Sequence, residues 1–244
     1  MKRRPPGSSK SRDVDDAERL RRIGERAAAE VQDESVVGLG TGSTAEAMIH
    51  ALGDRIASGL RITGVATSAR TAALANELHI PLHELDDVES LDLCIDGADE
   101  IDPGLDLVKG RGGALLYEKL VATRARRLLI IASSEKLVAS LGTRLPLPVE
   151  VIPWGWSHTA RAIADLGFSP ELRQTPGGDP FTSDGGHYIL DCAMGPITDA
   201  ASTATSLKLI TGVVDHGLFV GMADMALTVD ESGAIREHHR HRPR

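Results

Sequence analysis

Aromatic residues are scarce in this sequence, at 3% of 244 residues, so surfaces on which nucleobases stack are in short supply. Basic charge is also lacking: 35 acidic residues outnumber 27 Lys and Arg, which gives a formal net charge of −8. Proteins that bind nucleic acids or anionic membranes usually present a basic surface, so neither partner is expected. A small anionic substrate would need a local cationic pocket.

Long apolar runs are absent as well; one of the longest, 128–132, is far shorter than the roughly 20 residues of a membrane helix. No apolar signal-peptide core follows the basic N-terminus, so a cytoplasmic location is expected. The two cysteines, Cys94 and Cys192, lie in apolar, strand-like segments and lack any CxxC or Cys/His pairing. We interpret both as core residues rather than as metal ligands or a redox pair.

The sequence does contain a regular alternation of two patterns. Ala- and Leu-rich stretches with helical spacing alternate with short apolar, β-branched runs bounded by Gly, Asp or Pro. This alternation predicts an α/β fold with a doubly wound, mostly parallel sheet, whose ligands bind beyond the carboxyl ends of the strands. Helices are expected at 15–32, 43–58, 68–78 and 113–126, and strands at 35–39, 61–66, 80–84, 91–95 and 127–132.

The alternation breaks at the proline-rich segment 145–153, where the pattern becomes strand, helix, strand, strand, helix. We therefore expect a small α+β domain at 146–212. The main domain then comprises 15–145 and 213–235, with the last segment returning as strands to the main sheet. Both ends, 1–14 and 236–244, are expected to be disordered because they combine charge with Pro, Gly, Ser or clustered His.

The first motif with chemical meaning is GLGTGST (38–44), a glycine-rich turn between a predicted strand and a predicted helix. Glycines let the backbone approach an anion, the helix N-terminus supplies N–H groups, and Ser43 and Thr44 add hydroxyl donors. No lysine follows the last glycine and no acidic residue lies about 20 positions later, so nucleotides are not favoured. The motif predicts a phosphate site; the alternative is a tight turn with an ordinary helix cap.

The second motif is LDLCIDGADEID (91–102), an apolar strand that ends in several carboxylates. Asp96 and Asp99 flank Gly97-Ala98, a spacing that lets one tight turn present both side chains to one crevice. Such carboxylates can orient sugar hydroxyls, relay protons or bind a hard cation such as Mg²⁺. A solvated acidic turn is the alternative, and the lack of a nearby histidine disfavours a transition metal.

The third motif is KGRGGALLYEK (109–119), a lysine followed by glycines and then a predicted helix. Lys109 is a candidate for stabilising negative charge on a substrate oxygen. Glu118 lies within the helix, with the small residues Ala122 and Ala125 on the same side. Partial burial there would raise its pKa toward the value that a general base needs. The alternative is an ordinary surface Glu–Lys pair.

With these three motifs in this order, the chain resembles the ribose-5-phosphate isomerase type A family, and the resemblance continues through 133–153, 189–192 and 211–224. The resemblance implies a Rossmann-like sheet with a smaller lid domain, a homo-oligomer (dimer or tetramer), and no metal or organic cofactor. It also implies interconversion of D-ribose 5-phosphate and D-ribulose 5-phosphate through an enediolate, in the non-oxidative pentose phosphate pathway.

The family's site residues carry over to matching positions of this sequence. The predicted catalytic residues are Glu118 as the proton-abstracting base, Lys109, Asp96 and Asp99. The predicted substrate-binding residues are Thr41, Gly42, Ser43, Thr44, Asp96, Gly97, Ala98, Asp99, Lys109, Gly110, Arg111, Gly112 and Lys136. Two positions depart from the family pattern: Arg111, where glycine is usual, and Tyr117, where arginine or another polar residue is frequent.

Two other classes of function fit parts of the sequence. A related sugar-phosphate deaminase or lactonase could share the fold, but a deaminase would be expected to carry a histidine, and 38–44, 96–102 and 109–119 contain none. A sugar-phosphate-sensing domain of a transcriptional regulator would bind without turnover. It would need a DNA-binding module, and the basic arm at 1–12 is too short to be one.

Overall fold

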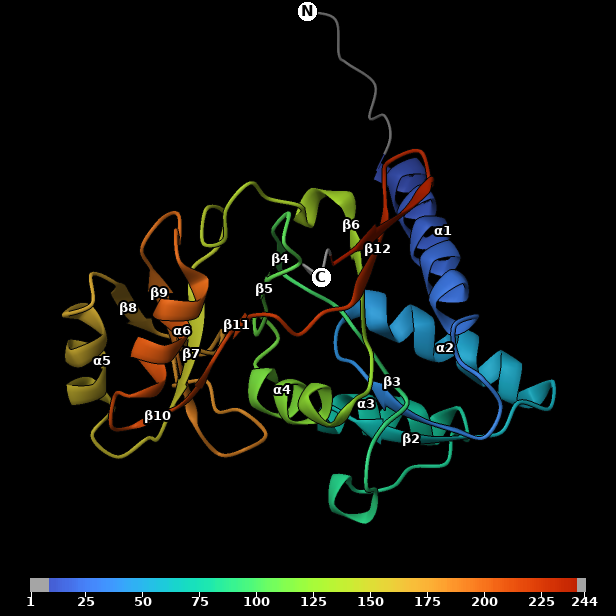
Figure 1. Ribbon diagram of the computed structural model, residues 1–244, viewed down its shortest axis with the longest axis horizontal. Coiled ribbons are helices and arrows are strands. Elements are labelled where there is room, and N and C mark those ends of the chain that lie inside the picture. The colour runs from blue at the N-terminus through green and yellow to red at the C-terminus, as the bar shows by residue number, and fades with distance from the viewer. Residues whose placement is uncertain (1–8, 241–244) are drawn as a thin grey trace, which may run out of the picture.

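The computed structural model of the protein describes residues 9–240, and Figure 1 shows them arranged in two lobes. The larger lobe is built on a six-stranded sheet with the order β13-β12-β6-β3-β1-β2. All neighbouring pairs are parallel except the β12–β13 hairpin. The strands are β1 (Ser35–Leu39), β2 (Ile62–Ala66), β3 (Leu93–Asp96), β6 (Leu128–Ser133), β12 (Met225–Val229) and β13 (Ile235–His239). The predicted α/β class with a mostly parallel sheet is confirmed.

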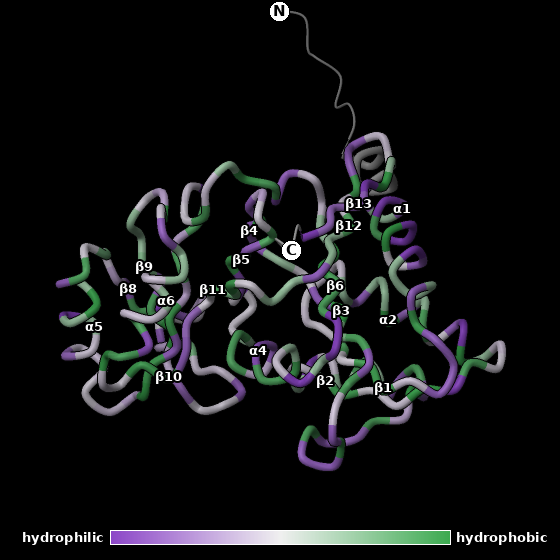
Figure 2. Tube along the Cα trace, viewed as in Figure 1, coloured by the Kyte–Doolittle hydropathy of each residue, from purple (hydrophilic) through white to green (hydrophobic). Residues whose placement is uncertain are grey.

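Helices cover both faces of this sheet, as a doubly wound fold requires. Helices α1 (Ser9–Ala28) and α2 (Ser43–Ala57) pack on one face, α3 (Ala69–Glu77) lies beside β2, and α4 (Leu115–Arg124) packs on the other face. Figure 2 shows α1 as largely hydrophilic, and its buried residues within 16–28 are Ile23, Gly24, Ala27 and Ala28. In β1, a Cβ on Gly38 would lie 2.7 Å from Val121 Cγ1, so glycine there lets α4 approach the sheet.

The smaller lobe contains an antiparallel sheet with the order β10-β7-β9-β8 and two helices. Its elements are β7 (Leu147–Val151), α5 (Trp156–Ala164), β8 (Ser169–Leu172), β9 (Tyr188–Ala193), α6 (Ala200–Lys208) and β10 (Val213–His216). A three-stranded sheet of β4 (Glu100–Ile101), β5 (Leu107–Val108) and β11 (Leu218–Phe219) lies between the lobes (Figure 1). Single 3₁₀ turns occur at Leu85–Asp87 and Ser134–Lys136.

Two expectations for strands are wrong. Segment 80–84 forms only one isolated bridge, between Leu82 and Gly64 of β2, because Pro81 has no N–H to donate to a ladder. Segment 213–216 does not return to the main sheet, because β10 pairs with β7 in the sheet of the smaller lobe. The chain rejoins the main sheet only at β12.

The predicted disorder of the two ends is wrong wherever the structure describes them. Residues 9–14 contain neither proline nor glycine and belong to α1. Residues 235–239 form β13, because pairing with β12 satisfies their backbone groups despite their polar composition. Arg240 then donates to the carbonyl oxygens of Ala223 and Leu105. The remaining parts of this expectation, 1–8 and 241–244, lie outside the described residues. Within 9–240, no helix has the length and hydropathy that crossing a membrane would require.

Candidate active site

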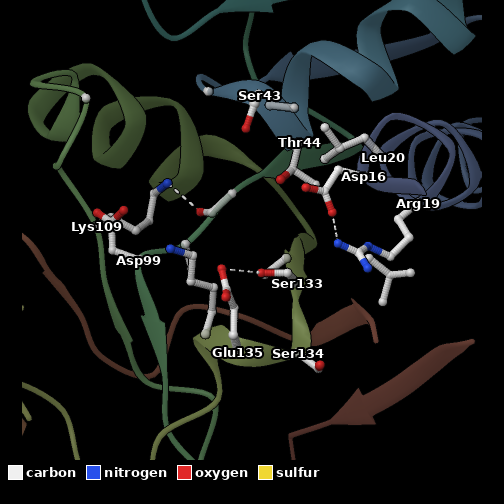
Figure 3. Close-up of a pocket in the computed structure, with 18 of the residues that line it drawn as sticks. Asp16, Arg19, Leu20, Ser43, Thr44, Asp99, Lys109, Ser133, Ser134 and Glu135 are labelled. Carbon is white, nitrogen blue, oxygen red and sulfur yellow. Dashed lines mark hydrogen bonds and ion pairs between the residues drawn. The ribbon is translucent and has the colours of Figure 1, made fainter. Parts of the chain in front are cut away.

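A cavity of about 1010 Å³ opens at the carboxyl ends of β1, β3, β6 and β12 (Figure 3). The loops that follow these strands line it, at 41–45, 97–99, 132–136 and 229–232. Of the predicted residues, those lining the cavity are Thr41, Gly42, Ser43, Thr44, Gly97, Ala98, Asp99, Lys109, Gly110, Gly112, Glu118 and Lys136. All three sequence motifs therefore meet at one edge of the sheet, where a doubly wound fold binds its ligands.

The glycine-rich loop forms the side of the cavity at the start of α2. Its Gly42 has a φ of 106° and is the N-cap of α2, so no side chain caps the first N–H groups of this helix. Figure 3 shows Ser43 and Thr44 at this helix end, facing the cavity. Uncapped N–H groups with neighbouring hydroxyls form a favourable site for an anion such as a phosphate.

A cluster of hydroxyl groups joins the glycine-rich loop to the segment at the end of β2 and the start of α3. The Thr41 hydroxyl lies 2.8 Å from the Thr67 and Ser68 hydroxyls and 3.2 Å from that of Thr71. Thr67 and Thr71 also donate to the carbonyl oxygens of Leu39 and Gly40. Because each hydroxyl is satisfied within the network, the loop is held rigidly before any ligand binds.

Three buried charged groups form the centre of the site. Lys109 Nζ lies 3.1 Å from Asp96 Oδ2 and 3.2 Å from Glu118 Oε1, and the three side chains are at most 6% exposed. Lys109 also donates to the Gly97 carbonyl oxygen at 2.6 Å. Asp96 Oδ1 accepts from the N–H groups of Thr41 and Gly97. Asp96 thus lies behind the cavity wall and joins the glycine-rich loop to the lysine.

Burial raises the pKa of Glu118 to about 8; the negative charge of Asp96 adds to this effect, and Lys109 opposes it. Its Oε2 atom is buried and has no hydrogen-bond partner. For Lys109, burial favours the neutral form, but Asp96 and Glu118 outweigh it and raise the pKa of the ammonium group. Lys109 therefore remains a cation, beside a carboxylate whose affinity for a proton is unusually high.

The smaller domain holds the lysine–glycine loop in place. Arg173 donates to the carbonyl oxygens of Gly110 and Arg111, at 2.9 and 3.0 Å, and forms an ion pair with Asp191. Asp99 Oδ2 accepts from the Arg111 N–H at 2.9 Å. Arg111 does not line the main cavity; it lines a second cavity of about 340 Å³, together with Arg173 and Asp191.

Part of the cavity wall comes from residues outside the predicted site. Asp16, Arg19 and Leu20 line it from α1, where their helical spacing places them on one face (Figure 3). The turn 230–232 between β12 and β13 lines it from another side. The helical spacing of these three residues can be seen in the sequence. Which face of α1 meets the cavity, however, depends on how α1 packs against α2 and the main sheet. Among residues 9–240, no group of three His, Cys, Asp or Glu side chains is arranged to hold a metal ion.

This arrangement can move a proton on carbon. A carboxylate with a raised pKa can abstract a proton next to a carbonyl group, and a fixed cation can stabilise the oxyanion that results. A site of this kind beside an anion-binding helix end defines an enzyme of the proton-transfer class that acts on small anionic substrates.

Comparison with known proteins assigns the family. The family model of ribose 5-phosphate isomerase A (phosphoriboisomerase A) matches residues 63–233. A ribose-5-phosphate isomerase A from Thermomicrobium roseum is 55% identical over 208 residues, covering 85% of this chain and 88% of that protein. A ribose-5-phosphate isomerase A from a Synechococcus species is 51% identical over 220 residues, covering 89% and 96%.

Solved structures agree with this assignment. The ribose 5-phosphate isomerase of Plasmodium falciparum superposes with a TM-score of 0.88 at 36% identity, covering 92% of this chain and 100% of that chain. A D-ribose-5-phosphate isomerase in complex with phospho-erythronic acid superposes with a TM-score of 0.87 at 35% identity, covering 91% and 99%. The chain belongs to the ribose 5-phosphate isomerase A family and is an isomerase. The resemblance stated from its motifs is confirmed.

Proposed function

We propose that this protein interconverts D-ribose 5-phosphate and D-ribulose 5-phosphate, a step of the non-oxidative pentose phosphate pathway. The observation that carries the proposal is the buried cluster of Asp96, Lys109 and Glu118 at a cavity that also presents the N-terminus of α2. The names of the relatives support the choice of substrate.

In the proposed mechanism, Glu118 removes the C2 proton of the open-chain aldose phosphate, and an enediolate forms. The same carboxyl group then returns the proton to C1, which gives the ketose. Lys109 stabilises the negative charge that develops on the carbonyl oxygen. Asp99, at the cavity wall, orients hydroxyl groups and moves protons between oxygens, while Asp96 holds Lys109 in place.

Binding of the phosphate group is assigned to the part of the cavity at the start of α2. The N–H groups at the start of α2, with the hydroxyl groups of Ser43 and Thr44, would donate to the phosphate oxygens, and Lys136, which lines the same cavity, would add a positive charge. Arg111 lines the neighbouring cavity, so we do not assign it a substrate contact.

Solvent exchange tests the function directly. Purified protein is incubated with ribose 5-phosphate and EDTA in D₂O and followed by NMR. We expect ribulose 5-phosphate to form with deuterium entering at C1 or C2, because the transferred proton exchanges with solvent while it is on Glu118. Binding without conversion or exchange would refute the isomerase reaction for this substrate and favour a sensing role.

The pH dependence of kcat/KM tests the assignment of the base. Glu118 must be ionised to accept a proton, so activity should fall as the pH drops through its pKa, which burial raises to about 8. The acid limb of the kcat/KM profile should therefore have an apparent pKa near 8, far above the ordinary glutamate pKa of about 4.3. A limb near pH 6 would instead report the substrate phosphate, whose second pKa is about 6.

We also propose that the protein acts in the cytoplasm as a homo-oligomer, either a dimer or a tetramer, as the family resemblance implies. Trp154 and Leu209 of the smaller domain are 88% and 80% exposed, and a second copy that covered them would gain stability from their burial. Sedimentation velocity distinguishes a monomer from either assembly.

A further inference from the structure

One aromatic ring contacts the catalytic cluster, although it lies outside the three motifs at 38–44, 91–102 and 109–119. Phe219 lies in β11, in the segment that connects the lobes (Figure 1), and it is fully buried. Its ring centroid is 5.5 Å from Lys109 Nζ and 4.9 Å from Lys119 Nζ. Both distances lie within the range in which a ring face attracts a cation.

The ring completes the surroundings of the Lys109 ammonium group. Three oxygen atoms hold this group: the Gly97 carbonyl oxygen, Asp96 Oδ2 and Glu118 Oε1. When Glu118 takes up the substrate proton, its attraction for the Lys109 ammonium group weakens. These three contacts alone would then let the ammonium group shift toward Asp96, which stays ionised. An aromatic face adds an attraction that does not change when Glu118 takes up or releases its proton.

The second cation at the ring, Lys119 of α4, is held by residues that precede β11 in the chain. Lys119 donates to Asp215 Oδ1 and to the His216 carbonyl oxygen, both at 2.5 Å. Asp215 also pairs with Lys208 of α6 at 3.0 Å. In β11, Leu218 and Phe219 pair with Val108 and Leu107, the two residues that precede Lys109. The backbone that carries the ring and the backbone that carries the lysine are thus neighbours in one small sheet.

We propose that Phe219 is a positioning residue of the isomerase reaction, whose ring holds the Lys109 ammonium group between Asp96 and Glu118. The proposal rests on the proposed function, because Lys109 stabilises charge only if an enediolate forms. This positioning role differs from simple packing, because packing depends on the volume of the Phe219 ring and not on the electron density of its face.

Site-specific fluorination of Phe219 separates these two roles. Successive fluorine atoms withdraw electron density from the ring face while nearly retaining its shape. We expect kcat to fall steadily along the series, by about 10-fold for the pentafluoro ring, with KM and Tm close to wild type. The matched control is the same series at Phe168, a buried residue of the smaller domain core, where kcat should stay constant.

A constant kcat along the Phe219 series would overturn the proposal, even if Phe219→Leu proves inactive or unstable. A second measurement does not depend on turnover: the crystal structure of Phe219→Leu should show Lys109 Nζ displaced from Glu118. An ammonium group that keeps its three oxygen contacts in that variant also overturns the proposal. Absence of turnover in the wild-type protein would refute the proposed function instead.

Discussion

Glu118→Gln should lower kcat by about 10⁴-fold with little change in KM, because it removes the only group assigned to take the proton from carbon. Glutamine keeps the shape of the side chain and an oxygen that can accept from Lys109, so substrate binding should be retained. Lys109 also keeps Asp96 as an ionic partner. Initial rates with ribose 5-phosphate measure both constants. A variant that keeps a tenth or more of the wild-type kcat would rule Glu118 out as the base.

The stability of this variant provides an independent check. Because the pKa of Glu118 is raised in the folded protein, its ionisation is disfavoured by folding. The contribution of Glu118 to the stability of the wild type should therefore decrease as the pH rises from about 4.5 to about 8. Glu118→Gln lacks this contribution, so its Tm should equal or exceed that of the wild type at pH 8.

Glu100→Gln is the matched control for a buried carboxylate without a catalytic role. Glu100 is fully buried and accepts from the N–H groups of Gly142, Arg144 and Leu145. A glutamine has one acceptor oxygen in place of two, so this variant should lose stability and keep most of its kcat. A large loss of kcat in both variants would indicate a general effect of disturbing buried carboxylates.

The meeting of the three motifs could be predicted from the sequence because it depends on strand ends. Segments 40–44 and 97–99 follow the apolar strands β1 and β3, which are parallel neighbours, so both loops emerge at the same edge. The glycines and the carboxylates are also local signals. A Cβ on Gly40 would collide with the Asp96 carboxylate, which shows how closely the two motifs pack.

The supporting contacts could not be predicted because they depend on pairing between distant segments. Thr67, Ser68 and Thr71 form an unremarkable polar run in the sequence, and they support the glycine-rich loop only because β1 and β2 are neighbours. Arg173 is about 60 residues from the loop that it holds. The same reason explains why residues 236–239, for which the polar composition predicts disorder, instead form part of β13.

Lys109→Met should lower kcat by about 10³-fold, because methionine fills a similar volume without the charge that stabilises the oxyanion. The loss should also move the pH profile. Lys109 lowers the pKa of Glu118, so its removal leaves Asp96 and Glu118 as two buried carboxylates without the cation that both contact. The proton on Glu118 is then held more tightly, and the acid limb of kcat/KM should move to higher pH.

Lys136→Met is the control that separates charge stabilisation from binding. Lys136 lines the same cavity but is only partly buried, and it is assigned to the substrate phosphate. Its loss should raise KM and leave kcat and the acid limb nearly unchanged, since a phosphate contact is the same in the ground state and the transition state. If Lys109→Met instead raises KM at constant kcat, as expected for Lys136→Met, Lys109 only binds substrate and the enediolate must be stabilised by another group.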